Sequence, residues 1–271
     1  MKLATQDKPF FPEGLEEKLE VVRSLGFDAF EIDGRLLVER FEEVKRAMSA
    51  TGVPVVTACG GYRGWIGDFD GERRKRAIRD IAEILRRLGE LGGKGIVVPA
   101  AWGMFSKRLP PHVPPRPEEE DRRVLLDSLE QLSRAAEETG THVYLEPLNR
   151  YEDHMLNRLG QAVSLIEEGR FSRVKVAADF FHMNIEEPRI EESILQARDY
   201  IGHVHLADSH RFQPGDGHLD FAPGLAALKE IGYDGYLAFE CRVRGKPEEA
   251  YPESVRYIRG LLSRLLEDPG Q

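Results

Sequence analysis

Cysteine is scarce in this sequence, and long apolar runs are missing. The chain has only two cysteines, Cys59 and Cys241, which are too few for a disulfide scaffold or a thiolate zinc cluster, so both are expected to be reduced. No segment approaches the roughly 18 consecutive apolar residues of a membrane helix. The N-terminal residues also lack the apolar stretch of a secretory signal. These absences predict a cytoplasmic protein that does not act at a membrane.

An excess of positive charge is missing as well. The chain has 38 Lys and Arg residues against 47 Asp and Glu residues, which gives a net charge of −9. This balance disfavours a large nonspecific nucleic-acid surface. Neither the G-x-G-x-x-G pattern of dinucleotide-binding folds nor the phosphate-binding G-x-x-x-x-G-K-[ST] pattern occurs. The expected partner is therefore a small molecule.

One structural unit recurs along the chain: a charged amphipathic stretch, a turn that contains glycine, and then a short apolar run. Glycine suits the left-handed position that ends a helix. The runs are rich in Val, Ile, Leu and Phe and hardly alternate with polar residues, which is typical of parallel strands covered on both faces. The six clearest runs are residues 27–32, 53–58, 94–98, 141–146, 203–206 and 233–240.

Two further expected strands, at residues 2–6 and 174–178, bring the count to eight strand–helix units. Eight is the number in a (β/α)8 TIM barrel, which commonly occupies about 250 residues as one domain. We therefore predict an α/β fold, a single TIM barrel over residues 1–271, ahead of an open doubly wound sheet. Residues 72–92 show apolar positions at helical spacing. The proline-rich stretch 109–117 is expected to be a loop.

The last four expected strands each carry a possible metal ligand at or near their ends: Glu146, Asp179, His205 and Glu240. In a TIM barrel these ends meet at one face. Three carboxylates and an imidazole brought together without a cation would repel one another and be costly to bury. The pattern thus predicts a divalent metal site. A carboxylate-rich set with one nitrogen favours Mn²⁺, with Mg²⁺ or Co²⁺ as alternatives.

Longer strings surround these positions. They are E-P-L-N-R-Y-E at 146–152, D-F-F-H-M-N-I-E-E at 179–187, H-V-H-L-A-D-S-H-R-F-Q-P-G-D-G at 203–217, and F-E at 239–240. Together they resemble the ketose 3-epimerases of the D-tagatose 3-epimerase and L-ribulose 3-epimerase type, in the xylose-isomerase-like TIM-barrel superfamily. The resemblance is strongest over residues 140–245, and the first half matches only in general architecture.

The resemblance implies that the same four residues hold the metal. It also implies that Glu146 and Glu240 form an acid/base pair, and that Glu152, His182 and Arg211 bind the oxygens of a sugar. The implied reaction is epimerisation at C3 of a free ketose, by proton abstraction and reprotonation through a cis-enediolate. Relatives of this kind are often homo-oligomers, which implies a dimer or a tetramer.

Other activities share these parts. An aldose–ketose isomerase moves a proton between neighbouring carbons, so one carboxylate could serve both steps. A keto-inositol dehydratase would expel a hydroxyl from the same enolate. An endonuclease IV-type nuclease could use His182, Asp216 and His218 as further ligands, but the strand ends at 57–61 and 96–100 supply no histidine and the net charge is acidic. A sugar-binding barrel without turnover is the nonenzymatic alternative.

Several aromatic and polar residues near the expected strand ends have open roles. Trp65, Trp102 and Phe105 could line a sugar or form a rim. His210 stands where many 3-epimerases have Asn, which affects the expectation for substrate recognition.

Two acidic residues and a histidine also have open roles. Glu31 and Asp33 could contact substrate, cap a helix or pair with Arg35. His203 lies two residues before His205 on the same face of a strand, and is expected to support the site or fill the core.

Overall fold

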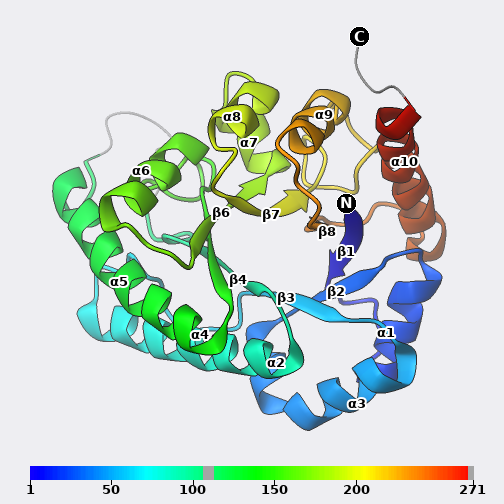
Figure 1. Ribbon diagram of the computed structural model, residues 1–271, viewed down its shortest axis with the longest axis horizontal. Helices are drawn as coiled ribbons and strands as arrows, with labels where there is room; N and C mark the ends of the chain where they lie inside the picture. The colour runs from blue at the N-terminus through cyan, green and yellow to red at the C-terminus, as the bar shows by residue number, and fades with distance from the viewer. Residues whose placement is uncertain (106–112, 268–271) are drawn as a thin grey trace.

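Eight parallel strands close into one barrel in the computed structural model, which describes residues 1–105 and 113–267. Each strand pairs with its neighbours in sequence, and the first strand also pairs with the last, which completes the ring (Figure 1). The predicted TIM barrel is confirmed. The strands are β1 (Lys2–Gln6), β2 (Ala29–Ile32), β3 (Val55–Cys59), β4 (Gly95–Pro99), β5 (His142–Glu146), β6 (Val174–Asp179), β7 (Ile201–Leu206) and β8 (Tyr236–Phe239).

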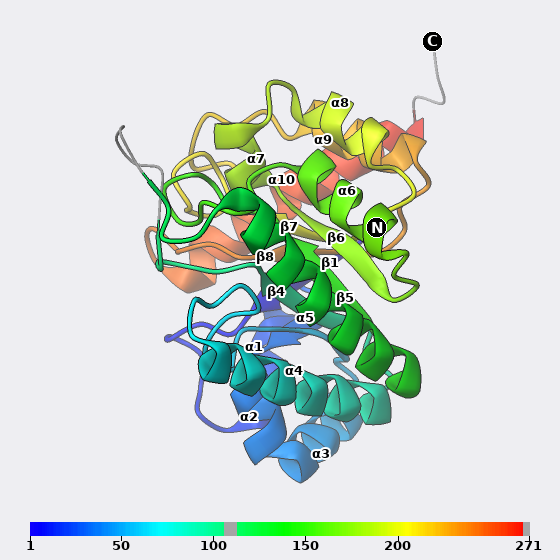
Figure 2. The same cartoon turned by 90° about the vertical axis from the view of Figure 1, so that its left-hand side faces the viewer.

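Helices connect successive strands and cover the outside of the barrel, as the two perpendicular views show (Figures 1 and 2). The segments after β2 and β6 each contain two short helices instead of one. The described helices are α1 (Leu15–Ser24), α2 (Gly34–Glu39), α3 (Phe41–Thr51), α4 (Gly71–Leu91), α5 (Glu118–Thr139), α6 (Leu159–Gly169), α7 (Phe180–Glu186), α8 (Ile190–Gln196), α9 (Ala222–Glu230) and α10 (Pro247–Glu267).

Helix α4 illustrates how local sequence sets these elements. The side chain of Asp70 accepts hydrogen bonds from the backbone N–H groups of Glu72 and Arg73 and so caps the first turn. Gly92 ends the helix in the left-handed conformation, with φ of 75°. Ile81 and Leu85, one turn apart, are buried against the barrel. The predicted helical stretch is confirmed.

The predicted loop at 109–117 falls partly outside the described residues. Its described part, 113–117, contains no helix or strand, and Pro117 is the residue before the first turn of α5. In the described part of the chain, no helix combines the length and the apolar character needed to cross a membrane.

Strand register brings polar residues together at one face of the barrel. Asp179, the last residue of β6, is level with His205 near the end of β7. Glu146 is the last residue of β5, and Glu240 directly follows β8. The remaining residues of these strands are mostly apolar and buried, so the polar side chains lie at the carboxyl ends, where barrel enzymes hold their active sites.

Candidate metal-binding active site

The four predicted metal ligands lie together. Glu146, Asp179, His205 and Glu240 each offer a donor atom, and these atoms all lie within 4.8 Å of one another. Nδ1 of His205 is central: it lies 2.7 Å from a Glu240 oxygen, 3.1 Å from a Glu146 oxygen and 3.7 Å from an Asp179 oxygen. Glu146, Asp179 and His205 are buried. One imidazole nitrogen therefore faces three carboxylates in the barrel mouth.

The electrostatics of this cluster match the chemistry of a cation site. Burial, and then the charge of Glu240, raise the pKa of Glu146 to about 8. For His205 burial acts to lower the pKa, but the charges of Glu31 and Glu240 raise it well above the usual value. Without a bound cation, the negative charges of these buried carboxylates thus favour protonation of Glu146 and of His205. Three hard oxygen donors and one nitrogen around a common point fit a divalent ion such as Mn²⁺, Mg²⁺ or Co²⁺.

Arg211 contacts this cluster directly. Its guanidinium lies 2.6 Å from an Asp179 oxygen and 2.5 Å from a Glu240 oxygen, and it stacks on the ring of Phe181. Arg211 adopts a left-handed backbone conformation, with φ of 66°, that few non-glycine residues take. Asp208 is not its side-chain partner, because that carboxylate accepts hydrogen bonds from backbone N–H groups of its own loop.

A second polar chain connects the other predicted sugar-binding residues. The backbone N–H and the side-chain amide of Asn149 lie 3.1 and 2.8 Å from Nδ1 of His182. A backbone N–H can only donate, so Nδ1 accepts and Nε2 carries the proton. The same Asn149 amide donates to Glu152, whose other oxygen accepts from the indole N–H of Trp102. Asn149 thus holds both His182 and Glu152, and it lies within the string at 146–152 although it was not among the predicted site residues.

The residues with open roles divide into those at the barrel mouth and those below it. Trp65 and Trp102 make an edge-to-face contact, with ring centroids 6.3 Å apart, and Trp102 is 57% exposed. Asp33 caps α2 through its side chain. Glu31 and His203 are buried beneath His205 and belong to a second group of donors.

Asp216 and His218 lie away from the cluster. Asp216 pairs with His210 and Arg244, and His218 contacts Ser209. Within residues 1–105 and 113–267, neither belongs to a group of three or more potential metal ligands. In the described part of the chain, Asp216 and His218 therefore do not add to the cluster the ligands that the nuclease alternative would require.

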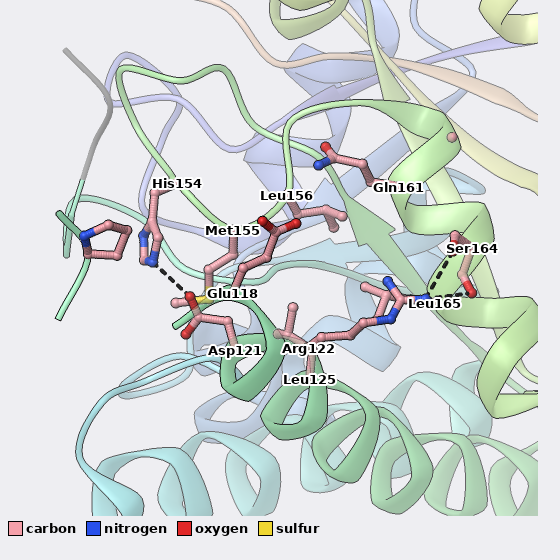
Figure 3. A pocket seen from close by; sticks show the side chains of 12 residues that line it. Glu118, Asp121, Arg122, Leu125, His154, Met155, Leu156, Gln161, Ser164 and Leu165 are labelled. Atoms are coloured by element: carbon pink, nitrogen blue, oxygen red, sulfur yellow. Dashed lines mark hydrogen bonds and ion pairs between the residues drawn. The ribbon is translucent and has the colours of Figure 1, made fainter. Parts of the chain in front are cut away.

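A separate cavity of about 290 Å³ lies outside the barrel wall, between α5 and α6 (Figure 3). It is lined by the first turns of α5 and by the segment 154–156, which follows β5. Its notable feature is a buried polar network: Asp121 pairs with Arg116 and lies 3.1 Å from Nε2 of His154. Arg116 also donates to the carbonyl of Gly67 and so ties the segment after β3 to the start of α5. This network has a structural role.

Replacement of Asp121 by Ala should lower the free energy of unfolding by about 3–5 kcal/mol, since it leaves the Arg116 guanidinium buried without its charge partner. Urea unfolding followed by circular dichroism measures the change. Glu138→Ala, at an exposed position of the same helix, is the control and should leave the midpoint nearly unchanged. Equal midpoints for the two variants would contradict the structural role of Asp121.

Known proteins that are similar to this chain share its TIM-barrel fold and are named as sugar epimerases. The family model described as "Xylose isomerase-like TIM barrel" matches residues 19–261. The chain is 52% identical to 3-dehydro-D-guloside 4-epimerase of Escherichia coli, across 96% of this chain and 99% of that protein. It is 30% identical to D-psicose 3-epimerase of Enterocloster bolteae, across 82% of this chain and 75% of that one.

A solved structure gives the same result. The apo crystal structure of E. coli 3-keto-D-glucoside 4-epimerase superimposes with a TM-score of 0.94 and 52% identity, and covers 96% of this chain and 99% of that one. These relatives are named as epimerases, which are isomerase-class enzymes. The predicted resemblance to epimerases and the predicted enzyme class are confirmed, and the chain belongs to the xylose isomerase-like TIM-barrel family.

Proposed function

We propose that this protein is a metal-dependent epimerase of keto-sugars that inverts C4 next to a ketone at C3 of a glycoside. The support is the 52% identity to a 3-dehydro-D-guloside 4-epimerase over nearly the full length of both chains. The sequence hypothesis of C3 epimerisation in a free ketose involves the same chemistry, removal of a proton from a hydroxyl-bearing carbon beside a carbonyl. The proposal changes which carbon reacts and keeps the predicted acid/base pair.

The placement of two carboxylates is the structural observation that supports epimerisation. Glu146 and Glu240 come from nonadjacent strands, β5 and β8, and both contact Nδ1 of His205. Epimerisation requires a proton to leave one face of a carbon and another to arrive on the opposite face, so it needs two acid/base groups. A substrate carbon held between these side chains would meet one carboxylate on each face.

Glu146, Asp179, His205 and Glu240 would hold the divalent ion, with Mn²⁺ first and Mg²⁺ or Co²⁺ as alternatives. Such an ion would supply Lewis acidity that polarises the ketone and so acidifies the C–H bond of the adjacent carbon, which bears the hydroxyl. Within the protein, one carboxylate takes the C4 proton while the electron pair of the C–H bond moves toward the ketone oxygen. The other then returns a proton to the opposite face, so the substrate loses one proton and gains one.

The neighbouring side chains would orient the sugar. Nε2 of His182 carries a proton and lies 4.0 Å from an Asp179 oxygen, so it could donate a hydrogen bond to a substrate oxygen in the barrel mouth. Glu152 would accept from a hydroxyl, and the fixed donors of Arg211 would bind an oxygen of the substrate. The homo-oligomeric state and the cytoplasmic location remain predictions.

Deuterium exchange distinguishes the candidate reactions. The Mn²⁺-loaded protein is incubated in D₂O with methyl 3-keto-D-glucopyranoside or with a panel of free ketoses, and NMR follows label and product. We expect deuterium at C4 of the keto-glycoside and the appearance of its 4-epimer. The 30% identity to a D-psicose 3-epimerase makes ketose 3-epimerisation the second candidate. Label at C3 of a ketose without reaction of the keto-glycoside would favour that candidate, and label at C1 with aldose formation would indicate an isomerase.

A further inference from the structure

A buried carboxylate with polar partners at both of its oxygens lies directly beneath the candidate metal site. Glu31, on β2, is only 1% exposed. One of its oxygens, Oε1, accepts from the side-chain amide of Gln6 at 3.0 Å and lies 2.8 Å from Nε2 of His205. The other, Oε2, accepts from the hydroxyl of Thr57 at 2.6 Å and lies 2.7 Å from Nε2 of His203. Four polar neighbours therefore surround this one carboxylate.

These contacts determine how His205 is oriented. The amide of Gln6 and the hydroxyl of Thr57 donate to the two oxygens, so Glu31 acts as an acceptor at both. Its contact with Nε2 of His205 then requires a proton on that nitrogen. Nδ1 is left as the atom that faces the three carboxylates of the candidate site. A carboxylate behind a ligating imidazole is a common way to fix its tautomer and ring orientation.

The donor atoms of Glu31, His203 and His205 also lie close together. Both oxygens of Glu31 already accept a side-chain hydrogen bond, one from Gln6 and one from Thr57, which favours a carboxylate held by protein atoms over a ligand of a second ion. The contacts of Glu31 with the two imidazoles, at 2.8 and 2.7 Å, are those of hydrogen-bonded or ion-paired groups. The group is therefore a support built of protein atoms.

We propose that Glu31 is a positioning residue that holds His205 in the tautomer and orientation needed to bind the metal ion through Nδ1, and that His203 acts by holding Glu31. This inference rests on the proposed metal-dependent function, and it concerns residues that do not touch the substrate. His203 is suited to the role because its ring stacks on Tyr144 and meets the ring of His205 edge to face. The two histidines and Glu31 thus form one packed unit inside the barrel.

The test measures binding of Mn²⁺ to metal-depleted protein without any sugar, from the electron paramagnetic resonance signal of free Mn²⁺. Glu31→Gln keeps the shape of the side chain but presents an N–H donor in place of one acceptor oxygen. We expect it to raise the Kd for Mn²⁺ roughly 10- to 100-fold. His203→Gln should have a smaller effect, and the double variant should bind no more weakly than Glu31→Gln, because residues that act through one another are not additive.

Glu186→Gln is the matched control, because Glu186 is also a buried glutamate but pairs with Arg150 outside the cluster. Its Kd for Mn²⁺ should equal that of the unmodified protein, and the unfolding midpoints of all metal-depleted variants should agree. If Glu31→Gln lowers that midpoint, Thr57→Val, which removes one donor to Oε2, takes its place with a smaller expected weakening.

Unchanged Mn²⁺ affinity in Glu31→Gln, or in Thr57→Val where that variant is used, would overturn the proposal. So would additive effects of the Glu31 and His203 substitutions on the Kd. Binding of two Mn²⁺ ions per chain would also overturn it. Because the measurement contains no substrate, it separates the two hypotheses. Weakened Mn²⁺ binding in a protein that epimerises no sugar would refute the proposed function and leave the role of Glu31 intact.

Discussion

Glu146→Gln and Glu240→Gln should each abolish epimerisation, with kcat lowered by a factor of at least ~10² to 10⁴, the range that general acid–base catalysis supplies. Glutamine has nearly the shape of glutamate but cannot take or deliver the proton at carbon. Loss of either partner leaves only one face of the carbon served. Formation of the 4-epimer from the keto-glycoside is followed by NMR at saturating Mn²⁺, since both residues are also candidate ligands.

Exchange of the substrate proton with solvent tests which face of the carbon each carboxylate serves. With one carboxylate left, each single variant should still exchange the proton of one epimer in D₂O with retention of configuration, and the two variants should prefer opposite epimers. The double variant should show no exchange. A single variant that epimerises at the original rate would refute the two-carboxylate mechanism, and the same epimer preference in both variants would assign both groups to one face.

Removal of the metal by a chelator should eliminate activity and lower Tm, and added Mn²⁺ should restore both. The cluster gathers three carboxylates in a largely buried site, and a cation bound only by the folded protein stabilises it by mass action. At a free concentration of ~100 times Kd the gain is about 2.7 kcal/mol, or roughly 5 °C for a domain of this size. Differential scanning calorimetry with and without Mn²⁺ measures the shift, which Asp179→Asn should diminish.

The size of this shift should depend on pH. Burial and the charge of Glu240 raise the pKa of Glu146 to about 8, so below that pH a metal ion must displace a proton from this carboxylate. The apparent affinity for Mn²⁺ should therefore rise between pH 6 and pH 8. An affinity that is constant over this range would show that Glu146 does not bind the ion.

Much of the fold follows from local signals. The stretch that forms α4 has a capping Asp70, a terminal Gly92 and apolar positions at helical spacing, and all three depend on residues near one another in sequence. The same holds for Glu146, Asp179 and Glu240, each of which directly ends a short apolar run. Barrel symmetry then brings these ends together without any knowledge of side-chain contacts.

The contacts that cross the barrel could not be predicted from the sequence. Glu31 and His205 are 174 residues apart, and no spacing rule links them. Asn149 bridges Glu152 and His182 only because the segments after β5 and β6 lie side by side. Which carbon of a sugar reacts depends on how the substrate lies in the mouth, and the proposal of C4 came from relatives rather than from a motif. Local pattern predicts which residues occur at the site, and tertiary packing decides how they are held.

The two halves of the barrel contribute different parts of the site. All four candidate ligands come from β5 to β8, whereas β1, β2 and β3 provide Gln6, Glu31 and Thr57, which brace the imidazole from below. Trp65 and Trp102 reach the mouth from the loops after β3 and β4. Insertions or substitutions in the early loops can thus alter which molecule is accepted without moving a donor atom, provided that the bracing residues stay. An enzyme divided in this way can vary part of its substrate contacts in the first half of the gene while the second half keeps the candidate ligands and the proposed acid/base pair.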